Sequence, residues 1–270
     1  MNITFIGGGN MAAAIIGGLL QQGNSPETLA VVEINTDRCT QLQHQFGINA
    51  GTTVAKSGVN CDIYVLAVKP QQLRAVVTEN ATLLHDKLVI SIAAGIRATD
   101  LSVWLDNQSD IIRAMPNTPC LIGKGVTGLY ALPGVNVSQK KQAAGILGAV
   151  GSVIWCDDEI QLDAVTAMSG SGPAYVFYLL EAMQQAGTEL GLSAETARRL
   201  SLETFIGASL LAADSHDSFS TLRTRVTSPG GTTEQAILSL EQANVKHALI
   251  DAIKAAHRRS QEIGHILSQS

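Results

Sequence analysis

The sequence predicts an α/β fold in which a doubly wound parallel sheet is followed by an all-helical region. Short apolar segments alternate with helical patterns through the first half of the 270 residues. Such alternation is typical of parallel strands that are covered by helices on both faces. Beyond residue 160 we find only helical patterns. We therefore expect two domains, residues 1–160 and residues 161–270.

The expected strands of the first domain are short and apolar. Ile63–Val68 is apolar at every position and lacks the alternation of a half-exposed strand, which indicates burial on both faces. The further expected strands are Asn2–Ile6, Leu29–Glu33, Leu88–Ala93 and Asp110–Ala114, with Gly125–Tyr130 and Gly151–Trp155 as added edge strands. Helices are expected from the first glycine turn to Gln22, over Asp37–Gln45, from Pro70, and over Ser138–Val150.

Helical patterns in the second domain cover residues 158–169, 173–190, 193–213, 232–243 and 245–268. The second of these helices is apolar nearly all round, since Glu181 is the only charge in residues 170–188. Such a helix requires burial on every side. A small helical domain can hardly surround it alone, so we infer a subunit interface. The alternative is a central helix in a monomeric bundle.

Composition narrows the class of protein. Hydrophobic residues make up 46% and charged residues 15% of the chain, as in a folded globular protein. The net charge of −5 argues against a nucleic-acid binder. We find neither a membrane span nor a secretory signal pattern, so we expect a cytoplasmic protein without membrane contact. The four cysteines are widely spaced, which predicts buried thiols and no metal site.

A glycine-rich turn follows the first expected strand and opens the first expected helix. It reads Gly7-Gly8-Gly9-Asn10-Met11-Ala12, the G-x-G-x-x-A pattern of Rossmann-type dinucleotide-binding folds. Gly7 permits a tight turn, Gly9 lets the backbone approach a pyrophosphate, and Ala12 permits close packing of helix on strand. The helix N-terminus offers N–H groups to the phosphates. The residues expected to bind a nicotinamide dinucleotide here are Ile6, Gly7, Gly8, Gly9, Asn10 and Met11.

The second expected strand ends on an acid, Glu33. A carboxylate at this position accepts hydrogen bonds from ribose hydroxyls and repels a 2′-phosphate, so Glu33 favours NADH over NADPH. Arg38 is close by in sequence and could serve a phosphate instead. We therefore expect NADPH or NADH as the cofactor, with NADH favoured.

Ligands of open parallel sheets gather at the carboxyl ends of the strands. Three such ends carry small residues or prolines that would shape a floor beneath the nicotinamide. The cofactor-binding residues expected there are Ala67, Val68, Lys69, Pro70, Ala93, Ala94 and Asn117. Taken by itself, Lys69 is also explained as a solvated lysine.

Five motifs occur in a specific order and spacing. They are Ala67–Pro70, Ser91–Gly95, Met115–Pro119, Ser169–Tyr175 and Val226–Thr233. Together they resemble the signature set of the pyrroline-5-carboxylate reductases, and the resemblance extends over essentially the whole chain. It implies an N-terminal Rossmann-type domain and a helical C-terminal dimerisation domain, assembled as a homodimer or a larger homo-oligomer. It also implies reduction of L-1-pyrroline-5-carboxylate to L-proline with NAD(P)H, the last step of proline biosynthesis.

The last of these motifs suits a carboxylate. Residues 228–231 are turn-forming, and Thr232 with Gln235 makes a capping-box pattern, so we expect a helix to begin near Thr232. N–H groups in front of that helix would form an anion site, although an ordinary capped helix is the alternative. The resemblance assigns the substrate carboxylate to Ser228, Gly231 and Thr232, and the ring nitrogen to the hydroxyl of Thr233, the expected catalytic residue.

Two further segments are open to more than one interpretation. The resemblance implies that Glu159 touches the substrate, but a solvated acidic linker over Asp157-Asp158-Glu159 is nearly as good an account. Ser169–Tyr175 breaks one helix and starts the next, with Pro173 suited to a first helical turn. We favour a structural role for this segment.

Two rival functions remain beside the imine reductase. One is a related reductase or dehydrogenase that acts on another small carboxylate, such as a six-membered cyclic imine or a 3-hydroxy acid. A lysine on a helix of the second domain would favour the hydroxy acid, and the helices offer only Lys246 and Lys254, both in the last one. The other rival is a non-enzymatic NAD(H) sensor, which would leave the second anion-binding loop unexplained.

Overall fold

The computed structural model describes residues 1–54 and 61–269. The chain forms two compact units, of which the first comprises Met1–Ser171 together with Ala256–Ser270 and the second comprises Gly172–Ala255. This division differs from the expected boundary at residue 160 because the helical turns after that residue still pack on the sheet. Leu162 and Val165 lie against Gly128 of the sheet. The last turns of the final helix also belong to the first unit.

The first unit is built on one mixed sheet. Within the described residues its eight strands follow the order β3-β2-β1-β4-β5-β6-β7-β8. Neighbouring strands are parallel except at the β6–β7 pair, which is antiparallel. The strands are β1 (Ile3–Ile6), β2 (Leu29–Val32), β3 (Asn49–Gly51), β4 (Ile63–Leu66), β5 (Leu88–Ser91), β6 (Ile111–Met115), β7 (Gly125–Ala131) and β8 (Gly151–Trp155). Order and direction confirm the doubly wound, Rossmann-type sheet.

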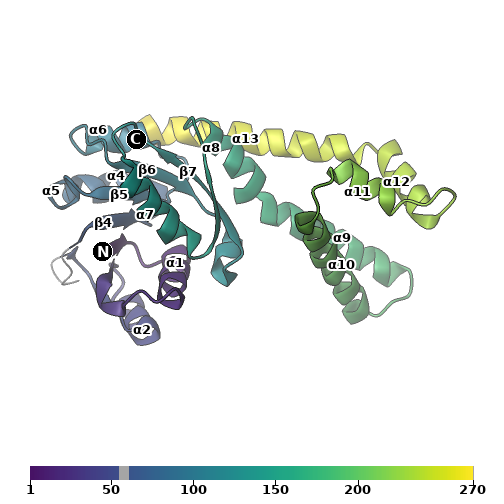
Figure 1. Ribbon diagram of the computed structural model, residues 1–270, viewed down its shortest axis with the longest axis horizontal. Helices are drawn as coiled ribbons and strands as arrows, with labels where there is room; N and C mark the ends of the chain where they lie inside the picture. The colour runs from purple at the N-terminus through teal and green to yellow at the C-terminus, as the bar shows by residue number, and fades with distance from the viewer. Residues whose placement is uncertain (55–60, 270) are drawn as a thin grey trace. The chain divides into compact units, whose positions relative to one another are not determined.

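Helices cover both faces of this sheet (Figure 1). One face packs against α1 (Asn10–Gln21), α2 (Thr36–Phe46) and α7 (Val137–Gly148). The other packs against α4 (Pro70–Glu79), α5 (Ala81–Leu84), α6 (Ala98–Trp104) and the end of α13 (Val245–Gln269). Alternate residues of a strand serve the two layers, since Ile3 and Phe5 belong to the first core and Ile6 to the second.

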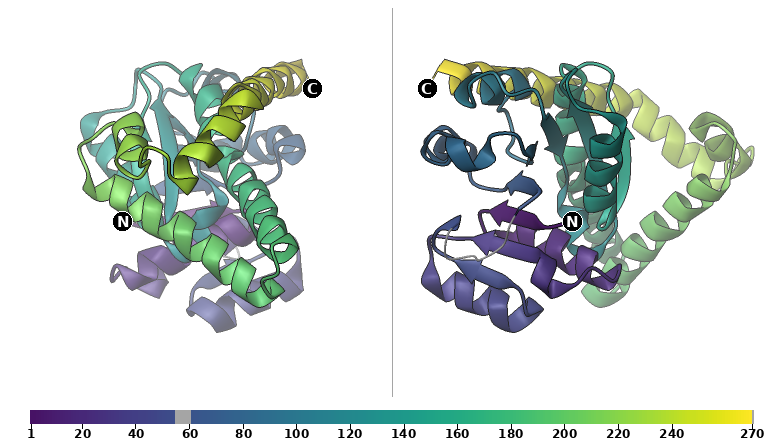
Figure 2. Two further views of the ribbon diagram at one scale, coloured as in Figure 1. Left: turned by 90° about the vertical axis from the view of Figure 1, so that its right-hand side faces the viewer. Right: turned by 60° about the vertical axis from the view of Figure 1, so that its left-hand side comes forward.

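The second unit is helical in all its regular structure among the described residues (Figure 2). It contains α9 (Gly172–Glu189), α10 (Ala194–Asp214), α11 (Phe219–Arg225), α12 (Thr232–Gln242) and the first part of α13. The sequence patterns predicted all of these except α11, which is short and polar. Its N-terminus is capped by the Ser218 hydroxyl, which accepts a hydrogen bond from Thr221 N–H at 3.2 Å.

Helix α9 has no buried residue within this chain. Its aromatic side chains are open, with Phe177 65% and Tyr178 73% exposed. The interpretation of α9 as the centre of a monomeric bundle is therefore wrong. Among the helices that the structure describes, none combines the length and apolarity needed to cross a membrane.

Candidate active site

The glycine turn joins the carboxyl end of β1 to the start of α1. Gly7 has φ +101°, and its N–H donates to the Val32 carbonyl at 2.8 Å. A Cβ at Gly7 would stand only 2.6 Å from the Ala67 carbonyl oxygen. The turn therefore lies so close to the end of β4 that only glycine fits. By contrast, a Cβ at Gly9 would meet nothing within 4 Å. Gly9 therefore leaves open space in front of α1.

Helix α1 begins with its N–H groups uncapped by any side chain. Gly9 is the N-cap residue and has no side chain with which to bond them. The first four N–H groups of a helix have no partner within the helix, and the positive end of the helix dipole lies beside them. Open space and free N–H groups at one point fit a dinucleotide pyrophosphate. The first turn of α1 is thus suited to the phosphates that the sequence assigned to it.

The Gly8 peptide is held by two charged side chains. Its N–H donates to Glu33 Oε2 at 2.9 Å, and its carbonyl accepts from Arg38 Nε at 2.7 Å. The other carboxylate oxygen of Glu33 accepts from Asn35 N–H at 3.0 Å. Glu33 is thereby fixed at the end of β2, next to the turn. Both Glu33 and Arg38 therefore lie beside the glycine turn, as the sequence predicted.

The loop after β4 contains the four expected residues Ala67, Val68, Lys69 and Pro70. Ala67 N–H donates to the Ile6 carbonyl at 2.8 Å, which holds this loop beside the glycine turn. Lys69 is exposed and serves as the N-cap residue of α4, and Pro70 is the first residue of that helix. The carboxyl ends of β1 and β4 therefore lie side by side, as the expected cofactor site requires.

The loop after β5 lies under the last helix. Ala93 is buried and Ala94 is exposed. Gly95, with φ +81°, is packed so closely that a Cβ there would lie 2.9 Å from Ile263 Cγ2. The sequence patterns did not predict this contact with α13.

Asn117 has a bracing role at the end of β6. Its Nδ2 donates to the Ser169 carbonyl at 3.0 Å, and its Oδ1 accepts from Val126 N–H at 3.0 Å. The side chain thus joins the loop after β6, the strand β7 and the segment before α9. The contact of Asn117 with the cofactor stays a prediction.

The segment before α9 contains an unexpected π-helical turn. It covers Thr166–Gly170 and follows α8 (Gln161–Val165). Ser171 N–H donates to the Thr166 carbonyl at 2.8 Å, an i to i+5 bond. Turns of this kind are frequent at functional sites. The two glycines at 170 and 172 were the available signal, and α9 begins at Gly172 with Pro173 in its first turn, as expected.

Glu159 is neither solvated nor part of a linker. Its Oε1 accepts from Arg113 Nη1 at 3.1 Å and from Ala98 N–H at 2.6 Å. The interpretation of residues 157–159 as a solvated acidic linker is therefore wrong for Glu159. Contact with the substrate stays a prediction for this residue, because the bonds described here involve only one of its two carboxylate oxygens.

The loop before α12 lies in the second unit. The expected capping box is wrong, because Thr232 is the first helical residue, Gly231 is the N-cap, and the cap has no side-chain bond. The side chain that reaches back over the start of α12 is that of Glu234, whose Oε2 accepts from Gly230 N–H at 2.8 Å. Gly231 N–H turns back to the Ser228 carbonyl at 3.0 Å. The N–H groups that open the helix, at Thr232 and Thr233, are therefore the ones suited to an anion.

The expected residues thus fall into two groups. All the cofactor residues belong to the first unit, at the carboxyl ends of β1, β2, β4, β5 and β6. Of the expected substrate residues, Ser228, Gly231, Thr232 and Thr233 belong together in the second unit, whereas Glu159 belongs to the first. Ser228 is exposed, whereas the Thr233 side chain is half-buried.

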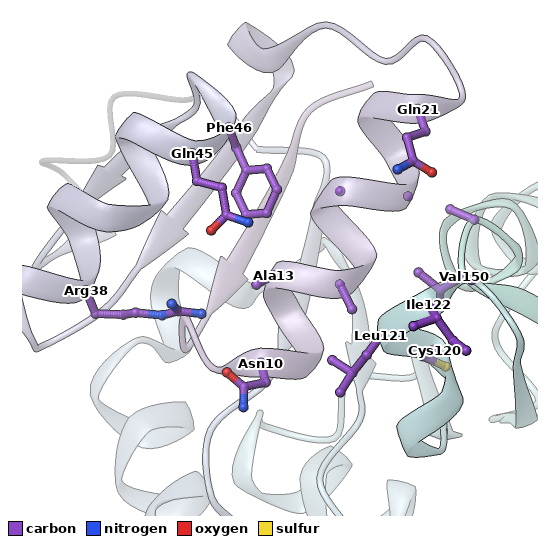
Figure 3. A pocket seen from close by; sticks show the side chains of 15 residues that line it. Asn10, Ala13, Gln21, Arg38, Gln45, Phe46, Cys120, Leu121, Ile122 and Val150 are labelled. Atoms are coloured by element: carbon purple, nitrogen blue, oxygen red, sulfur yellow. The ribbon is translucent and has the colours of Figure 1, made fainter. Parts of the chain in front are cut away.

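A hollow of about 490 Å³ runs along the outer side of α1 (Figure 3). Asn10 and Arg38 stand at the end nearest the glycine turn. Gln45 and Phe46 of α2 line one wall, and residues 120–123, at the end of a 3-10 helix, line the other. Asn10 is the one expected cofactor residue among those lining it. This hollow borders the dinucleotide turn but does not cover the strand ends.

Two known family models match this chain, one in its N-terminal part and one in its C-terminal part. Residues 159–263 match the model for pyrroline-5-carboxylate reductase dimerisation. Residues 2–95 match the model for coenzyme F420-dependent NADP oxidoreductases. The second match fits the glycine turn and its strands, and the first covers most of the helical unit.

Individual relatives match over nearly the whole chain. A pyrroline-5-carboxylate reductase of Pseudomonas aeruginosa is 46% identical over 99% of this chain and 98% of its own. That of Haemophilus influenzae is 40% identical, with 97% of each chain covered.

Solved structures agree in fold. A pyrroline-5-carboxylate reductase from Coxiella burnetii superposes with a TM-score of 0.92 at 43% identity, over 97% of this chain and 98% of that one. A Plasmodium falciparum pyrroline carboxylate reductase with NADP bound has a TM-score of 0.87 at 30% identity, over 98% of both chains. Identity at this level over full length exceeds what a shared fold alone produces. The chain therefore belongs to the pyrroline-5-carboxylate reductase family.

Proposed function

We propose that this protein reduces L-1-pyrroline-5-carboxylate to L-proline with NADH or NADPH, as the last step of proline biosynthesis. The observation that carries the proposal is the turn at β1, where Gly7 adopts a positive φ and Gly9 leaves open space in front of the uncapped first turn of α1, which suits a pyrophosphate. Family membership supplies the substrate. Bound reduced nicotinamide supplies the hydride for the imine carbon.

The cofactor would lie across the carboxyl ends of the strands. The glycine turn would hold the pyrophosphate, and Glu33 would accept the ribose hydroxyls with its fixed carboxylate. The loops after β4, β5 and β6 would support the nicotinamide. Glu33 favours NADH in this arrangement, and Arg38 beside it leaves room for the 2′-phosphate of NADPH.

The substrate would be held by the loop before α12. Ser228 and the Thr232 N–H that follows the N-cap Gly231 would bind its carboxylate, and the Thr233 hydroxyl would bond the ring nitrogen. A protonated imine is already electrophilic, so the protein mainly holds two reactants in attack geometry. When the carbon gains its hydride, the C=N double bond becomes single and the nitrogen becomes a neutral amine, while Thr233 stays hydrogen-bonded to it.

We further propose a homodimer or larger homo-oligomer formed through the helical unit. The exposed apolar side chains of α9 support it, because a surface of this kind is covered in a stable protein. The match to a dimerisation domain over residues 159–263 supports it too. The cytoplasmic location stays a prediction from the sequence.

The test is the loss of reduced-nicotinamide absorbance with pyrroline-5-carboxylate, run in parallel with NADH and NADPH. Turnover that yields proline supports the proposal. Folded protein that binds cofactor but does not reduce pyrroline-5-carboxylate with NADH or with NADPH would overturn the substrate assignment. Six-membered cyclic imines and 3-hydroxy acids would then be assayed, and inactivity on all of them would favour the NAD(H) sensor.

A further inference from the structure

The last helix, α13, belongs to both units of the chain. Its residues up to Ala255 are part of the second unit, which also contains the Ser228–Thr233 loop. From Ala256 onward it is part of the first unit, which contains the glycine turn. One uninterrupted helix therefore continues from the unit of the proposed substrate loop into the unit of the proposed cofactor site.

The end of α13 packs on the loop after β5 at very short range. A Cβ at Gly95 would lie 2.9 Å from Ile263 Cγ2 and 3.1 Å from Leu267 Cδ1. From the other side, a Cβ at Gly264 would lie 3.2 Å from the Gly95 carbonyl oxygen. Two glycines thus permit helix and loop to touch through their backbones. The position of α13 therefore bears directly on the loop that contains Ala93 and Ala94.

A buried hydrogen bond fixes α13 at this point. Ser260 Oγ donates to Asp163 Oδ1 at 2.7 Å, and the two residues are 7% and 6% exposed. A buried carboxylate without a donor is costly, so this bond specifies where α13 lies against α8. The two residues are 97 positions apart in sequence. The bond therefore joins the end of α13 to the rest of the first unit.

Asp163 is also connected to the loop after β6, through the helix on which it lies. Its helix, α8, continues directly into the π-helical turn Thr166–Gly170. The carbonyl of Ser169 in that turn accepts from Asn117 Nδ2, at the end of β6. The Ser260–Asp163 bond is thus connected to the loop after β5 through Gly95 and to the loop after β6 through Asn117.

We propose that Asp163 and Ser260 are positioning residues for hydride transfer, which hold the loops after β5 and β6 in register beneath the nicotinamide. The proposal rests on the proposed function. The two residues act through the backbone of these loops and not on the substrate. Alignment of this kind matters because a misplacement of about 1 Å can cost about a hundredfold in rate.

The test compares Ser260→Ala with Asp163→Asn, which loses the charge but keeps Oδ1 as an acceptor. We expect Ser260→Ala to lower kcat about tenfold and to raise the primary deuterium isotope effect from 4-deuterated NADH, because hydride transfer becomes slower. We expect Asp163→Asn to retain most of the activity. Ser268→Ala is the matched control, since that serine lies on the same helix and its hydroxyl donates within the helix, to the His265 carbonyl.

A purely structural role predicts a different result. Ser260→Ala would then have a lower Tm, while kcat and the isotope effect of the folded enzyme would stay at wild-type values, and this outcome overturns the proposal. Should Ser260→Ala fail to fold, Ser260→Cys keeps the unbranched side chain and weakens the donor, and the same two readouts apply.

A second readout separates this proposal from the proposed function. We expect Ser260→Ala to lower the fluorescence anisotropy of bound NADH and to raise its Kd severalfold, whereas Ser268→Ala leaves both unchanged. If wild-type protein binds NADH without turning over the imine, the proposed function fails and this binding comparison still decides the positioning role. Wild-type protein that binds neither NADH nor NADPH overturns both.

Discussion

Arg113 and Glu159 form an ion pair that is almost closed to solvent, with 3.1 Å between Nη1 and Oε1 and side chains only 4% and 12% exposed. The same carboxylate oxygen accepts the Ala98 N–H at the start of α6. That helix has no side-chain cap from its own N-cap residue. Glu159 therefore completes the N-terminus of α6 and ties it to β6.

We predict that Glu159→Gln lowers the free energy of unfolding by about 3 kcal/mol, because it leaves the Arg113 guanidinium buried without a counter-charge. Urea denaturation measures the loss. Glu203→Gln removes the partner of Arg199 from an exposed pair and should lower the free energy of unfolding far less. Equal losses in the two variants would contradict the structural role. A raised KM for the imine in folded Glu159→Gln would instead support substrate contact.

Sequence patterns identified the strands with apolar runs and missed the features that long-range contacts create. Ile63–Leu66 was predictable because a strand buried on both faces must be apolar throughout. Asn49–Gly51 was not, since this short edge strand pairs on one side only, with β2. The Arg113–Glu159 pair joins residues 46 positions apart, and no local pattern indicates it.

At the candidate site, the sequence predicted the glycine turn, whose geometry depends on the backbone. Gly7 and Gly9 were predictable because the dinucleotide turn requires glycine for stated geometric reasons. The capping box at Thr232 failed because the pattern allows either Gly231 or Thr232 as N-cap, and the chain uses Gly231. The two hydrogen bonds of Asn117 depend on Ser169 and Val126, which only the folded chain brings near.

We predict that Gly9→Ala and Gly7→Ala fail in different ways. Alanine at Gly9 fits the chain and should change Tm little, but its methyl group occupies the space for the pyrophosphate. We expect the Kd for NADH to rise by about tenfold or more, as the loss of one good phosphate contact implies. Isothermal titration calorimetry measures it.

Gly7→Ala should instead destabilise the fold, because the residue has φ +101° and its Cβ would stand 2.6 Å from the Ala67 carbonyl oxygen. We expect a loss of about 2 kcal/mol or more, seen as a lower midpoint in urea. A Gly7→Ala protein as stable as the wild type would show that the β1 turn differs from this description.

We predict that Glu33→Gln shifts the cofactor preference toward NADPH. The substitution removes the charge that repels a 2′-phosphate and keeps an oxygen that can accept the Gly8 N–H. The ratio of kcat/KM for NADPH to that for NADH should rise about tenfold, equivalent to about 1.4 kcal/mol. Glu27→Gln, at an exposed acid in the turn before β2, is the control. An unchanged ratio would remove Glu33 from cofactor discrimination.

We predict that stability falls in strong alkali through Tyr64. Burial of this residue in β4, together with the nearby Cys61 thiol, raises the pKa of the Tyr64 phenol to about 12. The unfolded phenol titrates near its ordinary pKa of about 10, so the folded state holds its proton more tightly. The stabilisation is complete below about pH 10 and is lost as the pH rises toward about 12, by about 2 kcal/mol.

Urea denaturation across this alkaline range measures the loss. Tyr64→Phe should show a smaller loss, since it removes the ionisable phenol. Burial also raises the pKa of Cys61, so part of the alkaline loss should remain in the variant. Identical pH profiles for the two proteins would exclude Tyr64 as a source.

The last prediction concerns the hydroxyl of Thr233. Thr233→Val keeps the side-chain volume of this half-buried residue and removes its oxygen. A hydrogen bond to a charged group contributes about 1.5–3 kcal/mol, so kcat for pyrroline-5-carboxylate should fall by about ten- to a hundredfold. Tm should change little, because the side chain lies in the first turn of α12, a helix without a buried residue.

Thr233→Ser retains the hydroxyl and should keep most of the turnover, which distinguishes loss of the oxygen from loss of packing. Steady-state kinetics with saturating cofactor measure both variants. A Thr233→Val enzyme with wild-type kcat would remove Thr233 from the mechanism. The ring nitrogen would then need another hydrogen-bond partner, and the Ser228 hydroxyl of the same loop would be the next side chain to test.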